Sequence, residues 1–299
     1  MQLLIIEILR AAAWLAIIAA AFVPLERLFA VHPQRVLRRG IAADLGYYFL
    51  STLLPSLVLA APLGLLAWCV RLAVPVSLHQ ATAALPLWAT VLISLVVSEV
   101  GYYWYHRLSH RIPLLWRFHS IHHSATEIDF LVNTRAHPVD MALGRFCGLA
   151  PLYLLGLGAS LGASGSVAPA AVALIGTAWS YFIHANLRWR FGPLEWLVST
   201  PAFHHWHHAL GGTETWNYAS TLPWIDRIFG TYFLPRQEWP NRYGINDPLP
   251  DSLAAQLTYP IHMARAVGPD VTLLQLNSSN RVPVTTLPPR LQRRMPWRL

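Results

Sequence analysis

Long apolar runs dominate this chain and restrict the folds that it can adopt. Residues 3–23, 45–70 and 85–105 each form a run close to or above the about 20 residues that a helix needs to cross a bilayer. A fourth run, 141–183, is long enough for two helices. Only 12% of the residues are charged, compared with about 25% in soluble domains. We therefore predict an all-α, polytopic membrane helical bundle of about four to five spans.

Prolines, glycines and arginines predict how these runs are arranged. Pro55 and Pro62 should kink the second run, and several glycines with Pro169 should break the fourth into a helical hairpin. The first run has no basic segment before it and no clear cleavage site, so we expect a retained, bilayer-spanning anchor. Three arginines in 32–39 place that loop in the cytoplasm and the N-terminus outside. The histidine-rich segments should then form a cytoplasmic metal-binding cap.

The charge and cysteine patterns exclude several classes of protein. The net charge of +8 comes from arginines that flank apolar runs, which argues against a nucleic-acid interface. The two cysteines, Cys69 and Cys147, stand alone, so an iron–sulfur cluster, a thiolate zinc site and a disulfide framework all lack their signature. We predict three regions: N-terminal spans in 1–84, a histidine-rich domain in 85–235, and a polar cytoplasmic extension in 236–299. The extension should be loosely ordered from about residue 268.

Histidines recur at helical spacing. A pair lies four residues apart in 106–110, and the segments 119–123 and 204–208 each repeat an i, i+3, i+4 pattern. These spacings put the rings on one helix face. His205 lies about 100° off its stripe and is the least expected ligand of its segment, whereas His137 and His184 are isolated but should lie at the same side of the membrane. The candidate metal ligands are His106, His110, His119, His122, His123, His137, His184, His204, His207 and His208.

The clusters supply about nine imidazoles, and a single zinc ion takes three or four protein ligands, so we predict two metals. Imidazole suits zinc, copper, iron and nickel alike. Redox chemistry beside a lipid favours two irons that activate dioxygen, with external electrons, to oxidise a C–H bond. Two non-redox alternatives stay open, a membrane transporter of zinc and a zinc hydrolase. A transporter should place its ligands near the bilayer midplane, and a hydrolase should carry an H-E-x-x-H motif, which the sequence lacks.

Three carboxylates are the predicted catalytic residues. Glu99 lies in the third run, seven residues before the first histidine of the 106–110 pair, at about 10 Å along a helix. This position suits a partner of a ligand, a proton relay or, equally, a hydrogen bond in helix packing. Asp140 and Asp226 are candidates for holding a ligand imidazole in one tautomer, and either could instead pair with Arg135 or Arg227. We predict no cofactor-binding residues beyond the metal ligands.

The three histidine motifs, H-x-x-x-H and two copies of H-x-x-H-H, resemble those of the fatty acid hydroxylase and sterol desaturase superfamily over roughly residues 99–235. Segments 182–186, 191–195, 200–208 and 224–231 look most like its alkylglycerol monooxygenase-like bacterial branch. The resemblance implies a helical membrane fold with a cytosol-facing di-iron centre that uses O2 to hydroxylate, or desaturate, a lipid. A sterol, carotenoid, fatty acyl chain, sphingoid base or ether lipid would each fit.

The resemblance also bears on the electron donor. No fused cytochrome b5 segment is recognisable in the sequence, so the electrons should come from a separate protein or a reduced small molecule, such as the pterin of the alkylglycerol branch. The chain is rich in arginine and contains no lysine, a composition that suggests a bacterial source and an inner-membrane location.

Overall fold

The computed structural model describes residues 2–158, 167–210, 215–246 and 249–266. Within these ranges the regular elements are helices, and the only ladder contact is an isolated bridge between Ala209 and Tyr243. The predicted all-α membrane architecture is confirmed. Four helical stretches are long and apolar enough to cross a bilayer: Gln2–Phe29, Ile41–Ala73, Leu87–Ser109 and Val167–His184.

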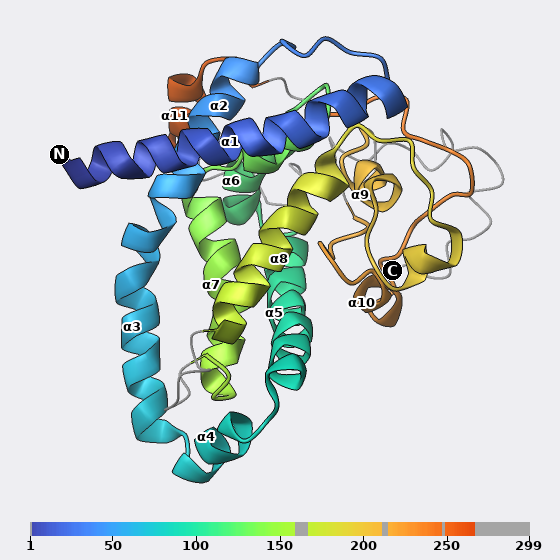
Figure 1. Cartoon of the computed structure of the whole chain (residues 1–299). Coiled ribbons are helices and arrows are strands. Elements are labelled where there is room, and N and C mark those ends of the chain that lie inside the picture. The colour runs from blue at the N-terminus through green and yellow to red at the C-terminus, as the bar shows by residue number, and fades with distance from the viewer. Residues whose placement is uncertain (1, 159–166, 211–214, 247–248, 267–299) are drawn as a thin grey trace.

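A lengthwise bundle forms the body of the molecule (Figure 1). It contains α3 (Pro55–Ala73), α5 (Leu87–Ser109), α7 (Pro138–Leu154) and α8 (Val167–His184). Helix α5 packs against α7 and α8, and α3 packs against α7. The short α4 (Val76–Ala83) joins α3 to α5 at the far end. Helices α7 and α8 are the two limbs of the predicted hairpin, and the residues between 158 and 167 lie outside the described part.

Two local features explain the course of the bundle. The predicted kink lies at Pro55, where α2 (Ile41–Leu53) ends and α3 begins with proline in its first turn, whereas Pro62 lies inside α3. Gly101 lets α5 approach α7 closely, because a side chain at this position would overlap the carbonyl oxygen of Cys147.

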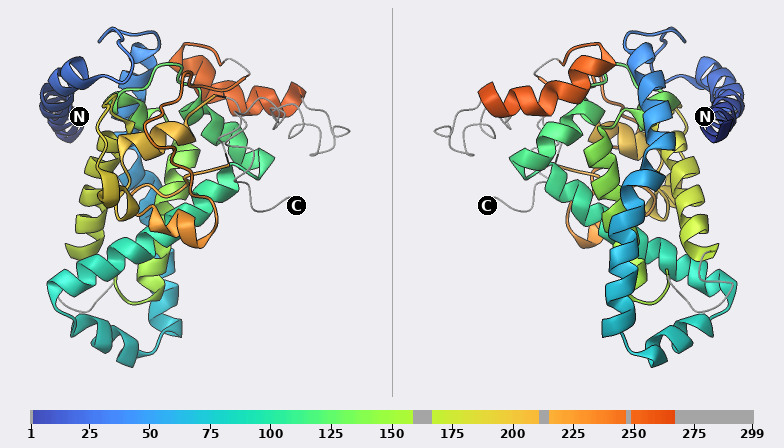
Figure 2. Two further views of the ribbon diagram at one scale, coloured as in Figure 1. Left: turned by 90° about the vertical axis from the view of Figure 1, so that its right-hand side faces the viewer. Right: turned by 90° about the vertical axis from the view of Figure 1, so that its left-hand side faces the viewer.

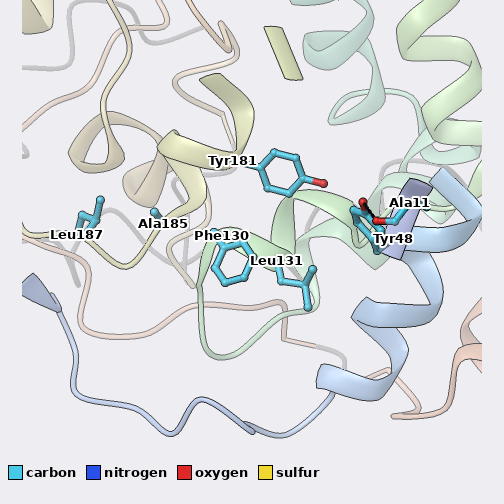
Figure 3. Close-up of a cluster of buried hydrophobic side chains, with 7 residues drawn as sticks. All are labelled: Ala11, Tyr48, Phe130, Leu131, Tyr181, Ala185 and Leu187. Atoms are coloured by element: carbon cyan, nitrogen blue, oxygen red, sulfur yellow. Dashed lines mark hydrogen bonds between the residues drawn. The ribbon is translucent and has the colours of Figure 1, made fainter. Parts of the chain in front are cut away.

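Helix α1 (Gln2–Phe29) lies across the bundle rather than along it. It runs across the top of Figure 1 and is seen nearly end-on in Figure 2, which is turned by 90°. Its second half packs into a core cluster made by α1, α2, α8 and the 3-10 helix η1 (Phe130–Thr134). Figure 3 shows the buried members, which are Ala11, Tyr48, Phe130, Leu131, Tyr181, Ala185 and Leu187. The hydroxyl group of Tyr48 donates to the carbonyl oxygen of Ala11 at 2.7 Å. The predicted anchor is thus helical, but it is not parallel to the other apolar helices.

The remaining elements lie around the α1 end of the bundle, except that α10 (Trp224–Ile228) lies beside the middle of α5 (Figures 1 and 2). They are α6 (Pro113–His123), η1, η3 (Gly192–Trp196), α9 (Pro201–His207), α10 and α11 (Leu253–Ala266). Helix α11 belongs to the predicted polar extension, yet it packs against α2 and α6. The segment expected to be loosely ordered, from about residue 268, lies outside the described residues.

Candidate metal centre

The candidate ligands lie at the C-terminal ends of helices. His106 is in the last turn of α5 and His110 caps it, His122 and His123 end α6, and His184 ends α8. His204 and His207 lie in α9, and His208 caps that helix. Exposed carbonyl groups give a helix C-terminus a partial negative charge, which favours a nearby cation. Four helix ends therefore direct both their side chains and their dipoles at one region.

Nine imidazoles gather there in two adjoining groups. The first contains His106, His110, His119, His123 and His207, and the second contains His122, His184, His204 and His208. Within each group the candidate ligand atoms lie within 4.8 Å of one another. The rings of His123 and His208, one from each group, have centroids only 4.4 Å apart. The two groups are thus side by side, and every member except the partly buried His110 is buried.

Several Nε2 atoms of these rings face one another and have no ordinary hydrogen-bond partner. The Nε2 atoms of His184 and His204 are 2.9 Å apart, and those of His184 and His122 are 3.2 Å apart. Within the described residues, Nε2 of His106 and of His207 is buried without any partner. Buried polar atoms without partners are costly and uncommon. Metal ions would satisfy them, so the residues present fit a pair of imidazole-bound ions.

Burial keeps these rings in the form that binds metal. Burial, and next the charge of His119, lower the pKa of His122 to about 3. Burial likewise lowers the pKa of His123, His204 and His208 well below the ordinary value, and neighbouring imidazoles add to the effect. A metal-binding imidazole must be neutral. These four imidazoles are therefore neutral at neutral pH.

Backbone carbonyl groups fix the orientation of several rings. Each of these rings uses Nδ1 to donate to a carbonyl oxygen, which leaves Nε2 facing the centre. The pairs are His106 with Tyr218 at 2.6 Å, His207 with Trp216 at 2.7 Å, His184 with Ser180 at 2.7 Å, and His122 with Arg135 at 3.1 Å. Sequence reasoning missed these partners, because any residue type can supply a backbone carbonyl group.

Asp140 is the one carboxylate among the described residues that contacts a candidate ligand. Its two oxygens lie 3.1 and 3.2 Å from Nδ1 of His119, and it also accepts a hydrogen bond from the hydroxyl group of Tyr105. Burial by itself would raise the pKa of Asp140, but the charge and hydrogen bond of His119 hold it below its usual range. Asp140 is therefore ionised and orients His119. Tyr105 was not predicted, although a buried hydroxyl group next to a ligand in the sequence calls for a polar partner.

Comparison with known proteins agrees with this geometry. Residues 91–231 match the family model of the fatty acid hydroxylases. The chain carries a fatty acid hydroxylase domain. The resemblance predicted from the three histidine motifs is thus confirmed. This hydroxylase domain contains all nine histidines of the two groups.

Three relatives have lipid-related names. Ornithine lipid hydroxylase OlsE of Rhizobium tropici is 36% identical over 184 residues, which cover 58% of this chain and 51% of that protein. The alkylglycerol monooxygenases of Xenopus tropicalis and Danio rerio are 28% and 30% identical, and each match covers 50% of this chain and 32% of the relative. The chain therefore spans about half the length of the first relative and about a third of the other two. No solved structure matches the chain significantly.

The other two predicted carboxylates support a loop of the hydroxylase domain and touch none of the nine histidines. Glu99 accepts from the backbone N–H of Thr221 at 2.7 Å. Asp226 accepts from the backbone N–H groups of Tyr218 and Ala219, both at 2.8 Å. Burial raises the pKa of Asp226 to about 7, against hydrogen bonds that lower it. The loop that these carboxylates hold contains the carbonyl group of Tyr218, which accepts from Nδ1 of His106.

The arginines that could have paired with Asp140 and Asp226 are engaged elsewhere. Arg135 forms a buried ion pair with Asp44 at 2.6 Å, and Arg227 stacks on the ring of Trp196. Asp140 and Asp226 therefore form the hydrogen bonds described above and no ion pair with these arginines.

Two histidines lie outside both groups of the hydroxylase domain. His137, predicted as a ligand, caps α7 by accepting from the N–H group of Val139 at 3.1 Å, and its Nε2 contacts the carbonyl oxygen of Leu257. His205, the least expected ligand, contacts the hydroxyl group of Tyr243 at 2.8 Å and the carbonyl oxygen of Ala185 at 3.1 Å. The structure thus brings together nine of the ten predicted ligands and leaves His137 apart.

Proposed function

We propose that this protein is an integral membrane di-iron oxygenase that hydroxylates a C–H bond of a lipid with O2 and electrons from an external donor. The observation that carries the proposal is the pair of adjoining, largely buried imidazole groups at one end of an apolar helical bundle. One ion cannot use nine ligands, so the two groups suit two ions. The match to the fatty acid hydroxylase family model favours redox chemistry over hydrolysis or transport. When bound, iron would supply the dioxygen and redox chemistry that side chains alone lack.

The chain's own residues have defined tasks in this proposal. The nine imidazoles hold the two ions, Asp140 and the backbone carbonyl groups keep the rings in one tautomer, and burial excludes water from the centre. The site lies at one end of the apolar bundle, and we infer that a lipid tail enters it from the bilayer. Hydroxylation is favoured over desaturation because the relatives are named as a hydroxylase and as monooxygenases. The substrate is therefore a lipid, and the donor is a separate protein or a reduced small molecule.

The topology is also part of the proposal. The loop 32–39, with its three arginines, lies at the same end of the molecule as the histidine groups. By the positive-inside rule this end faces the cytoplasm. We infer that the protein lies in a bacterial inner membrane with its centre on the cytoplasmic side.

Metal analysis with one variant from each group tests the proposal. We expect purified protein in detergent to contain two irons per chain and, once reduced, to consume O2. His207→Ala removes a ligand of the first group and His204→Ala one of the second, so each should lose iron and oxygen uptake. His137→Gln is the matched control, because it changes a histidine outside both groups, and it should keep both properties. A single tightly held zinc ion, or an iron content that is the same in His204→Ala and His207→Ala as in wild type, would refute the di-iron centre.

A further inference from the structure

A groove runs along the second half of α1, and none of the nine histidines lines it. It is enclosed by α1, the segment 30–37, the start of α2 and η1, and it holds about 560 Å³. One wall is apolar and is made by Leu15, Ala19, Val23, Leu45 and Phe130. We call it the α1 groove. A cavity with one apolar wall is suited to an aliphatic chain.

Three exposed arginines, which we call the rim arginines, line the α1 groove. Arg27, Arg35 and Arg188 are exposed, and none of them forms an ion pair with a carboxylate among the described residues. Arg27 donates only to the carbonyl oxygen of Gln34, at 3.2 Å. The rim arginines are therefore cations without acidic partners among the described residues, which suits them to a phosphate group.

The acidic side chains at the groove are already satisfied. Asp129 forms a buried ion pair with Arg38 at 2.6 Å. Glu26 accepts from the backbone N–H groups of Phe130 at 2.8 Å and Asn186 at 2.9 Å, which ties the end of α1 to η1 and to the segment after α8. Neither acid neutralises the rim arginines. The groove thus combines an apolar wall with the positive charge of the rim arginines.

The direction of α1 places this groove at the level of lipid headgroups. Helix α1 lies across the bundle (Figures 1 and 2), so it cannot cross the same bilayer in the direction of α3, α5 and α8. Apolar side chains are exposed at both of its ends, including Leu3 at 79% and Leu28 at 67%. A helix that lies along the surface of a bilayer buries such side chains in the boundary between headgroups and acyl chains. The rim arginines then meet the phosphate layer.

We propose that α1 lies along the membrane surface and that the α1 groove binds the anionic headgroup of a membrane phospholipid. The phosphate group contacts Arg27, Arg35 and Arg188, and an acyl chain follows the apolar wall. The site is separate from the metal centre, and its occupation needs neither iron nor turnover.

Native mass spectrometry of the full chain in detergent tests the lipid site. Phosphatidylglycerol, phosphatidylcholine and inorganic phosphate are added separately to wild type and to Arg35→Ala/Arg188→Ala. The control, Arg39→Ala/Arg71→Ala, removes the same charge outside the groove, since Arg39 pairs with exposed Asp251 and neither residue lines the cavity.

We expect wild type and control to retain phosphatidylglycerol at least tenfold better than phosphatidylcholine, and the groove variant to lose this preference. Equal retention of the two lipids, an unchanged groove variant, or binding of inorganic phosphate alone would overturn the proposal. A dimer that forms without lipid and is broken by the groove variant would assign the groove to a second copy of the chain.

A depth measurement tests the direction of α1 independently. In a Cys69→Ser/Cys147→Ser background, Leu3→Cys and Leu28→Cys each carry a fluorophore in nanodiscs, and quenching by labelled lipids reports the depth of each. A surface helix puts both ends at a similar depth in one leaflet. A spanning helix would separate them by about 38 Å, at 1.5 Å per residue, and labels in opposite leaflets would overturn the proposal.

Discussion

Asp140→Asn tests whether a carboxylate outside the two histidine groups controls the metal centre. The change keeps the size of the side chain but removes its negative charge and replaces one acceptor oxygen with an amide donor. In the native structure both oxygens lie within 3.2 Å of Nδ1 of His119, and the hydroxyl group of Tyr105 donates to the same carboxylate. The amide cannot satisfy both donors as well. It also weakens the preference for the tautomer that leaves Nε2 of His119 free.

The size of the expected effect on metal affinity follows from the loss of this carboxylate. Removing such a partner of a metal ligand typically lowers metal affinity or activity by about 10–100-fold. This range corresponds to about 1.4–2.8 kcal/mol, at about 1.4 kcal/mol for each factor of ten. Tyr105→Phe removes a single hydrogen bond from the same carboxylate, so its effect should be smaller, about 0.5–1.5 kcal/mol.

Competition with a chelator measures the effect. Protein loaded with iron is titrated with chelator, and the retained iron and the oxygen uptake are followed together. Asp251→Asn is the matched control, since it removes one negative charge from an exposed residue far along the chain. It should behave as wild type. An Asp140→Asn variant with unchanged iron affinity and activity would refute the argument that this carboxylate orients His119.

Three further results follow from the structure. Glu99→Gln keeps an oxygen that can accept from the 218–222 loop, so oxygen uptake should fall less than about tenfold; complete loss would instead indicate that Glu99 carries a proton. Gly101→Ala would push a methyl group into the carbonyl oxygen of Cys147, so it should lower the free energy of unfolding by about 1–3 kcal/mol and with it the thermal unfolding temperature. Gly176→Ala is the control, because the space around Gly176 is open, and it should leave the unfolding temperature unchanged. Burial lowers the pKa of His205 to about 4, below the about 6.5 of an unfolded chain, so the unfolded state binds more protons between these values. In the metal-free protein His205 should therefore contribute ~3 kcal/mol to the stability that is lost as pH falls through this window, in addition to the loss from the other buried histidines. Thermal unfolding at pH 7.5 and 5 should show a smaller loss for His205→Asn than for wild type; equal losses would contradict this.

The sequence was sufficient to predict the class of fold and most of the candidate centre. Apolar runs of bilayer length specify membrane helices whatever their partners, because no other single-segment structure satisfies the backbone within lipid. Spacings of three and four residues place rings on one helix face. His119, His122 and His123 could therefore be placed on one helix face before any tertiary contact was known, and the off-stripe position of His205 predicted that it lies apart from its neighbours.

The tertiary structure decided how these segments meet. The division into groups of five and four cannot be derived from spacing, because adjacent residues such as His122 and His123 face different groups. His137 falls outside both because it begins α7, and its ring caps that helix instead. Glu99 and Asp226 could not be separated from Asp140 by their spacing either. Which backbone N–H or imidazole reaches a carboxylate depends on contacts between segments more than 100 residues apart, as for Glu99 and Thr221.

The direction of α1 shows most clearly the difference between what the sequence determines and what the tertiary structure determines. Its length and hydropathy are those of a spanning helix, and these are properties of the sequence alone. Its position across the bundle is set by the hydrogen bond from Tyr48 to Ala11 and by the hydrogen bonds that Glu26 accepts from two backbone N–H groups. Local composition fixes how apolar a helix is, whereas only packing between distant segments fixes its direction.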